Sequence, residues 1–352
     1  MWELTSETVP DYLRGTGRVP VDLRITAREL SGGVSNVVIR VDVAGRPPLV
    51  IKQCRERLRV AMEWRARLDR IWAEQAALEI LADVLPTGTV PAVLFEDRGN
   101  YLFAMSCAPD TSTTWKAQLM EGSVNPQIAA RLGTILAAIH ADSRNHPELW
   151  RRLSDTSLFD ELRIDPYYRT TAQARPEAAS RIEALIASMD LPGSERTLVL
   201  GDFSPKNILV HPAGLILLDF ECAHAGDPAF DLGFFLSHLT LKAVYWSIRS
   251  PGREAAYLEL PFHFWDAYLR RLGNSPWPAE RLVPRAIEHT AACLLARVDG
   301  KSPVEYLDPQ GQNVARRLGL RALSERPASW AEMSALVAEG LGQRTSAASV
   351  RD

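Results

Sequence analysis

Residues 198–221, LVLGDFSPKNILVHPAGLILLDFE, constrain the fold more than any other part of the chain. Short apolar runs at residues 208–210 and 215–218 flank a turn that contains Pro and Gly, which predicts a β-hairpin. In the simplest antiparallel register, Asn207 and Asp219 meet at the open end of the hairpin, where cross-strand neighbours lie about 5 Å apart. The hairpin therefore brings an amide oxygen and a carboxylate together.

This pair of oxygen ligands predicts a cation site. Oxygen atoms from two strand ends that face solvent suit a hard divalent cation such as Mg2+. Asp202 precedes Asn207 by five residues, on a loop that Pro205 stiffens, and is a candidate general base. Asp and Asn also favour loops for structural reasons alone, but three such residues at compatible spacing around one hairpin favour a catalytic site.

Three segments, LGDFSPKN, LLDFE and GDPAFDL, carry a family resemblance. In order and spacing they resemble the catalytic and metal-binding loops of the protein-kinase-like fold, and most closely its small-molecule branch. That branch includes aminoglycoside phosphotransferases, choline kinases and methylthioribose kinases. The resemblance covers most of the chain and is sharp between residues 198 and 242.

The resemblance implies an α+β fold with two lobes. Residues 1–108 would form a small β-rich lobe, and residues 109–352 a larger, mainly helical lobe. ATP and Mg2+ would bind between the lobes, and the γ-phosphoryl group would pass to a hydroxyl of a small molecule. No segment after Asp219 resembles a protein-kinase activation loop ending in Ala-Pro-Glu, which disfavours a polypeptide acceptor.

Residue roles follow from the same resemblance. Asp202 would accept the proton of the acceptor hydroxyl or orient that hydroxyl, and Lys206 would neutralise charge on the transferring phosphoryl group. Asn207 and Asp219 would hold the cation that bridges the phosphates. Glu221 would either tune the metal-binding acid or point away from it, and it is a candidate for binding the acceptor.

One departure from the family lies beside the catalytic acid. Relatives usually carry His before Gly-Asp, and this chain carries Leu200. The histidine supports the backbone of the metal-binding loop in kinases, so its absence removes a hydrogen bond. Because no group that would touch the substrates is missing, activity is expected to survive. Asp227 and Asp231, in the GDPAFDL segment, are expected to brace the catalytic loop.

A glycine loop is expected near the N-terminus. Gly32, Gly33 and Ser35 lie between expected strands at residues 25–30 and 37–43. Glycines between two strands let backbone N–H groups approach phosphate oxygens closely. An ordinary hairpin turn is the alternative, because the segment departs from the full G-x-G-x-x-G pattern.

Lys52 ends an aliphatic strand over residues 49–52. Glu74 falls on the apolar stripe of an expected helix over residues 59–85, and a carboxylate there is costly unless it is paired. Lys52 is its candidate partner, as in the lysine–glutamate pair that orients ATP phosphates in kinases. Glu74 could instead reach water at the edge of the stripe. Six arginines near the helix entry indicate a solvated face more than an anion site: Arg55, Arg57, Arg59, Arg65, Arg67 and Arg70.

A hinge and an acceptor pocket complete the expected site. By resemblance, Met105 would lie beside the adenine, and backbone groups from Ser106 to Ala108 would form hydrogen bonds with it. A plain linker would look the same. Three polar residues on an interhelical loop are candidates for the acceptor pocket, or form a solvated turn: Arg297, Asp299 and Lys301. The Gly-Lys-Ser there is no Walker A motif, because Leu295 stands where that motif requires glycine.

Composition limits the partners. The chain has 352 residues, 46% hydrophobic and 24% charged, with a net charge of -3, so no basic footprint for nucleic acid or an anionic membrane is present. The first residues lack the pattern of a signal peptide, and no apolar run reaches membrane-spanning length. Four widely spaced cysteines indicate free thiols and a cytoplasmic protein. The protein is expected to be a monomer or a homodimer.

The sequence leaves the acceptor open. Aminoglycosides are polycations that would need a carboxylate-rich pocket, and the C-terminal region has both signs of charge without an acidic cluster. A neutral sugar, a thiosugar or an amino alcohol is equally credible. The alternative function is a catalytically silent nucleotide-binding module, a pseudokinase, motivated by Leu200 and the shortened glycine loop.

Overall fold

The computed structural model describes residues 2–30, 36–55, 67–273 and 275–342. The chain divides into two compact units. The first unit contains Met1–Thr113 and Leu209–Glu221, and the second contains Thr114–Ile208 and Cys222–Asp352. The sequence-based division after residue 108 assigned the hairpin to the helical lobe, whereas most of it clusters with the β-rich unit.

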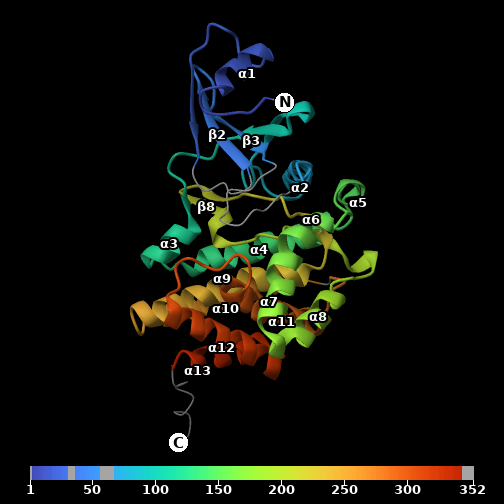
Figure 1. Ribbon diagram of the computed structural model, residues 1–352, viewed down its shortest axis with the longest axis vertical. Coiled ribbons are helices and arrows are strands. Elements are labelled where there is room, and N and C mark those ends of the chain that lie inside the picture. The colour runs from blue at the N-terminus through green and yellow to red at the C-terminus, as the bar shows by residue number, and fades with distance from the viewer. Residues whose placement is uncertain (1, 31–35, 56–66, 274, 343–352) are drawn as a thin grey trace, which may run out of the picture. The chain divides into compact units, whose positions relative to one another are not determined.

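An antiparallel five-stranded sheet forms the centre of the first unit, with strand order β1-β2-β3-β5-β4. Strands β2 and β3 are labelled in Figure 1. Alternate side chains of the strands point into a core that includes Ile39, Val41 and Ile51, as expected for a sheet with one covered face. Tyr12 and Leu13 of the short helix α1 join that core. The strands are β1 (Ile25–Glu29), β2 (Asn36–Val43), β3 (Leu49–Cys54), β4 (Val93–Asp97) and β5 (Leu102–Ser106), and α1 is Val9–Gly15.

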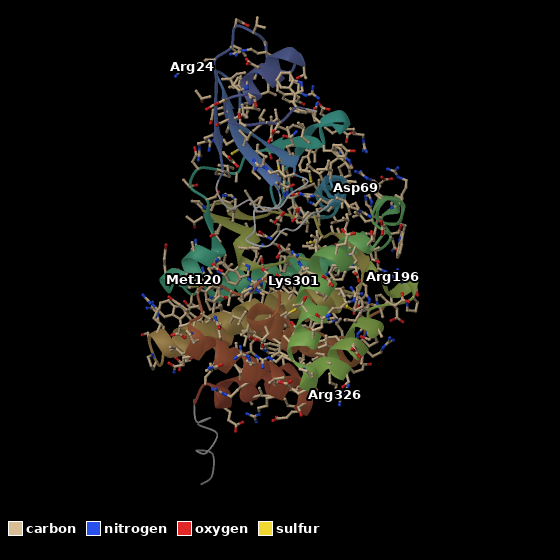
Figure 2. The ribbon with its side chains drawn as sticks, in the orientation of Figure 1. Arg24, Asp69, Met120, Arg196, Lys301 and Arg326 are labelled. Carbon is tan, nitrogen blue, oxygen red and sulfur yellow. The ribbon has the colours of Figure 1, made fainter. Side chains whose placement is uncertain are left out.

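Helix α2 (Arg70–Val84) follows β3 in the chain. The sequence predicted a start near residue 59, but residues 67–69 are not helical, and residues 56–66 lie outside the described part. Asp69, labelled in Figure 2, stands at the N-cap position. The helix ends before Leu85, which is extended, because Pro86 disfavours a helical conformation in the residue before it.

The predicted hairpin is confirmed. Strands β8 (Ile208–His211) and β9 (Gly214–Leu217) are hydrogen-bonded neighbours. The backbone N–H of Leu217 also donates to the carbonyl of Thr89, 2.8 Å away, which ties β9 to the first unit. The metal-binding candidate Asp219 follows two residues after that anchor.

The second unit is mainly helical (Figure 1). Helix α9 is buried around nearly its whole circumference and packs against α10 and α11. Gly133 of α4 lets α10 approach closely, because a Cβ there would clash with the carbonyl of Phe264. The elements are α3 (Trp115–Glu121), α4 (Pro126–Ser143), α5 (Pro147–Arg152), α6 (Ser157–Phe159), the π-helical η2 (Asp160–Arg169), α7 (Thr170–Ala174), α8 (Pro176–Ser188), β7 (Thr197–Val199), the short turn η4 (Pro205–Asn207), β10 (His224–Gly226), α9 (Pro228–Arg249), α10 (Glu254–Leu272), α11 (Ala279–Asp299), α12 (Pro309–Glu325) and α13 (Trp330–Gly340).

All four cysteines are free thiols; Cys54, Cys222 and Cys293 are buried, and Cys107 is half-buried. Within the described ranges, none of the helices combines the length and apolar character needed to cross a membrane.

Candidate active site

Lys52 and Glu74 form the predicted ion pair in the first unit. Lys52 lies on β3, a central strand, between Val38 of β2 and Phe103 of β5. Its Nζ lies 2.6 Å from Oε2 of Glu74, which projects from α2, and both side chains are buried. A carboxylate on the buried stripe of α2 is thus compensated by a cation from the sheet.

Asp219 joins this pair. Its Oδ1 lies 2.9 Å from Nζ of Lys52, and its backbone is left-handed, with φ of 69°. Aspartate tolerates that conformation better than most residues, because its short side chain can form local hydrogen bonds. Burial lowers the pKa of Lys52, but Asp219 and Glu74 more than offset that effect, so the pKa is raised and the ammonium is charged. Burial raises the pKa of Glu74 to about 7, against the opposing effect of Lys52.

Glu221 contacts two side chains of the first unit. Its Oε2 accepts a hydrogen bond from Nδ2 of Asn36, 3.1 Å away, and lies 3.5 Å from Nε of Arg70. Arg70 is fully buried, and its guanidinium also donates to the carbonyls of Arg67 and Arg55. For Arg70 the interpretation as part of a solvated face is therefore wrong. Its position four residues before Glu74, on the same helix face, was the signal that could have indicated burial.

Asp202 lies in the predicted catalytic loop, residues 200–207, in the second unit. Its Oδ2 is 2.8 Å from Nζ of Lys206 and 3.0 Å from a guanidinium nitrogen of Arg163. Asn207 donates from Nδ2 to the backbone carbonyl of Asp202, 3.0 Å away, across η4. The loop thereby fixes the amide of Asn207 relative to Asp202, and Asp202 itself is only 5% exposed.

Arg163 was not identified from the sequence. It lies on η2, and its Nε donates to the carbonyl of Gly201, 2.7 Å away, while another nitrogen contacts Asp202. Arg163 precedes Asp202 by 39 residues in the chain, so no local pattern connects the two.

Asp231 braces the catalytic loop from behind. Its two carboxylate oxygens accept the backbone N–H groups of Leu200, at 2.7 Å, and Gly201, at 2.9 Å. His140 lies behind it, with Nε2 3.4 Å from Oδ2 of Asp231, and is a fully buried core histidine. The loop next to Leu200 is therefore held by a carboxylate rather than by the histidine that relatives usually carry.

Asp227 has a structural role at the start of α9. Its carboxylate accepts the backbone N–H of Ala229, 3.0 Å away, and so caps the helix. The same side chain forms an ion pair with Arg285 of α11. The two acids of the GDPAFDL segment thus hold the helical core and the catalytic loop together.

Gly201→Ala is expected to destabilise the protein and lower activity. Gly201 has φ of 73°, and a Cβ there would lie 2.6 Å from Cβ and 2.8 Å from the carbonyl oxygen of Cys222. The left-handed backbone costs about 1–2 kcal/mol for alanine, and the overpacking adds roughly 1–3 kcal/mol. Gly45→Ala is the matched control, because Gly45 has φ of 74° and open space around it. Equal losses of unfolding free energy in urea titrations of the two variants would contradict the close approach.

The expected hinge residues end strand β5. Met105 is buried, and the backbone N–H of Ser106 donates to the carbonyl of Ala92, 2.9 Å away. That N–H is therefore already hydrogen-bonded within the first unit. Ala108 lies beyond the end of β5. The glycine-loop candidates Gly32, Gly33 and Ser35 lie outside the described residues.

Contrary to the sequence prediction, the three acceptor candidates do not share an interhelical loop. Arg297 and Asp299 lie in the last turn of α11, because the helix continues to Asp299, and Lys301 follows the helix. Arg297 points toward the catalytic-loop side, where it donates to the hydroxyl of Tyr167, 2.9 Å away. Asp299 instead binds Arg175 and Arg316, at 2.7 and 2.8 Å. These two partners hold the pKa of Asp299 at about 2, against the opposing effect of burial.

Lys301, labelled in Figure 2, pairs with Asp165 of η2 at 2.7 Å and is partly exposed. Asp299 and Lys301 therefore form ion pairs, whereas Arg297 donates to a neutral hydroxyl group.

The fold is that of the protein-kinase-like small-molecule kinases. A choline/ethanolamine kinase family protein from Mesorhizobium loti superposes with a TM-score of 0.53 and 16% identity, covering 95% of this chain and 99% of that one. An amicoumacin kinase superposes with a TM-score of 0.56 and 14% identity, covering 91% and 94%.

The model of the phosphotransferase enzyme family matches residues 26–273, and the chain belongs to that family. A methylthioribose kinase from Pectobacterium atrosepticum is 27% identical over 267 residues, which cover 68% of this chain and 66% of that enzyme. The chain thus spans just under two thirds of the length of this relative.

Proposed function

We propose that this phosphotransferase transfers the γ-phosphoryl group of ATP, with Mg2+, to a hydroxyl of a small molecule. The observation that carries the proposal is the cluster of buried Lys52 and Glu74 with half-buried Asp219. A charged lysine held between two carboxylates suits the binding of phosphates and a cation. Residues 1–113 with 209–221 would be the nucleotide lobe, and the rest the acceptor lobe.

The donor set fits Mg2+. Asp219 and Asn207 offer a carboxylate and an amide, both hard oxygen ligands. Across the described residues no group of three or more His, Cys, Asp and Glu side chains gathers as a metal site. Mg2+ usually binds one or two protein ligands and completes its shell with water and substrate phosphates, so Asn207 and Asp219 are sufficient. When bound, Mg2+ neutralises the phosphate charge that would otherwise oppose transfer.

The acceptor lobe positions the nucleophile. Asp202 would accept a hydrogen bond from the acceptor hydroxyl and take its proton as the oxygen attacks the γ-phosphorus. A new O–P bond forms, the bond from the γ-phosphorus to the β–γ bridging oxygen breaks, and ADP leaves with that electron pair. Lys206 and Arg163, which both contact Asp202, place positive charge beside the loop.

The support of Asp231 for the loop favours an enzyme over a silent module. Leu200 was one of the two features that motivated the silent module, the other being the shortened glycine loop. The backbone N–H groups of Leu200 and Gly201 donate to Asp231. Gly32, Gly33 and Ser35 would cover the phosphates, and Met105, Ser106 and Ala108 would line the adenine, as the family resemblance implies.

A turnover assay tests the proposal. Protein, ATP and Mg2+ are mixed with pooled sugars, amino alcohols, hydroxy acids and aminoglycosides; ADP release and phosphorylated products are followed by mass spectrometry. We expect acceptor-dependent turnover that needs Mg2+ and is lost in Asp219→Asn. Nucleotide binding without turnover across the panel would instead support the silent module.

A further inference from the structure

Lys242 is a buried lysine that forms no ion pair with any described residue. It lies in the middle of α9 and is 1% exposed. Its Nζ donates to the hydroxyl of Tyr306, 2.9 Å away, and lies 4.3 Å from the centre of that ring. In the part of the chain that the structure describes, no carboxylate forms an ion pair with it. A buried ammonium is costly unless it is paired, so neither core packing nor a structural ion pair accounts for this lysine.

Arg297 adds a second cation without a carboxylate partner among the described residues. It projects from α11 and donates to Tyr167 and to Oγ of Ser302, 3.0 Å away. Its buried Nε has no hydrogen-bond partner among those residues. Tyr167 also lies 5.5 Å from the guanidinium of Arg163, which binds Asp202. A continuous row of contacts therefore leads from Arg297 to the catalytic acid.

The charges around this row do not balance. Five cations lie in it or beside it. Arg163 and Lys206 bind Asp202. Lys242 and Lys116 lie 4.3 and 5.8 Å from the centre of the Tyr306 ring. Tyr306 follows Val304 by two residues, and the backbone N–H of Val304 donates to the carbonyl of Arg297, 2.9 Å away. The facing carboxylates are Asp202, which binds Arg163 and Lys206, and Glu305, which binds Lys116. Lys242 and Arg297 have no carboxylate partner among the described residues. Burial lowers the pKa of the nearby His238, and the charges of Arg297 and Lys242 lower it further. His238 is therefore neutral at pH 7, and neither ring nitrogen has a hydrogen bond within the described ranges.

We propose that the acceptor carries an oxyanion, a carboxylate or a phosphate, which binds Lys242 and Arg297 while the hydroxyl of the acceptor lies at Asp202. This inference rests on the proposed function and names its substrate class. Polycationic aminoglycosides are excluded by the same charges, because like charges at one site cost several kcal/mol. Phosphates of the nucleotide are the rival occupant, and the experiment separates the two.

The protonation of Lys242 supports the assignment. Burial, followed by the charges of Lys116 and Arg297, lowers the pKa of Lys242 to about 7, and Glu305 opposes them only in part. His238 and Tyr306 face it as neutral groups. A bound anion favours the charged ammonium and raises its pKa. Affinity for an anion should therefore be highest below pH 7 and fall as pH rises through and beyond 7, by roughly tenfold over two pH units.

The first experiment measures anion binding. Melting temperatures of the full chain are recorded with inorganic phosphate, with acetate and with chloride at equal ionic strength, because a ligand of the native state raises the melting temperature. We expect a saturable rise with phosphate or acetate that persists under saturating ADP and Mg2+. Whichever of the two anions gives the tighter binding identifies the oxyanion. A rise that ADP abolishes would assign the site to the nucleotide, and no rise above chloride would overturn the proposal.

Variants of α9 locate the site. Lys242→Met removes the buried charge and should fold with a melting temperature no lower than wild type, yet lose the anion effect. Lys242→Arg should retain part of it. Arg249→Met is the matched control, because Arg249 lies on the same helix and is exposed, and it should behave as wild type. An anion effect that survives in Lys242→Met would overturn the assignment.

Turnover then separates this inference from the proposed function. Matched acceptors are compared: glycerol with glycerate and glycerol 3-phosphate, and glucose with gluconate and glucose 6-phosphate. We expect ADP release with the acidic members and a KM at least about tenfold higher in Lys242→Met. Turnover of neutral or cationic alcohols that Lys242→Met leaves unchanged would overturn the inference and leave the kinase intact. Anion binding through Lys242 in a protein without any ATP turnover would overturn the proposed kinase function and leave an anion site at Lys242.

Discussion

Asp202→Asn is expected to lower kcat roughly 10²–10⁴-fold, the usual contribution of a positioned proton acceptor. Asparagine keeps the shape of the side chain and one acceptor oxygen, but it cannot take the proton of the acceptor hydroxyl. The dissociation constant of ATP should change little, because the proposed nucleotide ligands Lys52 and Asp219 belong to the other unit. Single-turnover kinetics with the acceptor found in the turnover assay measure the chemical step directly.

The variant also leaves Arg163 and Lys206 without their carboxylate, so a folding control is needed. Circular dichroism and the melting temperature should show a native fold, because Lys206 is exposed and can return to water. Asp266→Asn is the matched control: Asp266 is an exposed aspartate on α10 that pairs with Arg270, and it should retain full turnover. A folded Asp202→Asn protein with kcat within a factor of about two of wild type would refute the role of Asp202.

The parts of the site that could be predicted from the sequence depend on local patterns. The hairpin follows from two apolar runs around a turn, and the ion pair of Lys52 with Glu74 follows from helical periodicity and the cost of an unpaired buried carboxylate. Both features are properties of a few neighbouring residues. Family resemblance then gave Asp231 a bracing role, and the hydrogen bonds to Leu200 and Gly201 explain how it is performed.

The parts of the site that could not be predicted from the sequence depend on packing between distant segments. Arg163 meets Asp202 only because η2 lies beside the catalytic loop, and Lys242 meets Tyr306 across 64 residues of chain. Arg70 was grouped with five other arginines near it in sequence, although its spacing to Glu74 was a signal of burial, and its contact with the distant Glu221 appears only in the structure. A signal for Lys242 did exist: a lone lysine in a long apolar helix has no solvated face to occupy.

Lys52→Met is expected to give the largest loss of stability. Removing one partner of a buried ion pair leaves an uncompensated charge and typically costs roughly 3–5 kcal/mol. Here the lysine compensates two carboxylates, of which Glu74 is 2% exposed. Adding Glu74→Gln in the same chain should recover most of the loss, because the buried charge is then gone. Urea unfolding followed by circular dichroism measures the free energy of unfolding of each variant.

The dependence on pH identifies the source of the loss. Burial already raises the pKa of Glu74 to about 7 in the presence of Lys52, and without the lysine that pKa rises further. A carboxyl group whose folded pKa exceeds its unfolded value binds its proton more tightly when folded, so stability falls as pH rises from the unfolded pKa of about 4.5 toward the folded pKa. The deficit of Lys52→Met should therefore be small near pH 5 and grow toward pH 8, while the double variant should show no such growth. Lys301→Met, which breaks a partly exposed pair with Asp165, should cost at most about 1 kcal/mol at any pH. A deficit of Lys52→Met that is equally large at both pH values would show that lost packing, rather than the isolated charge of Glu74, destabilises the variant.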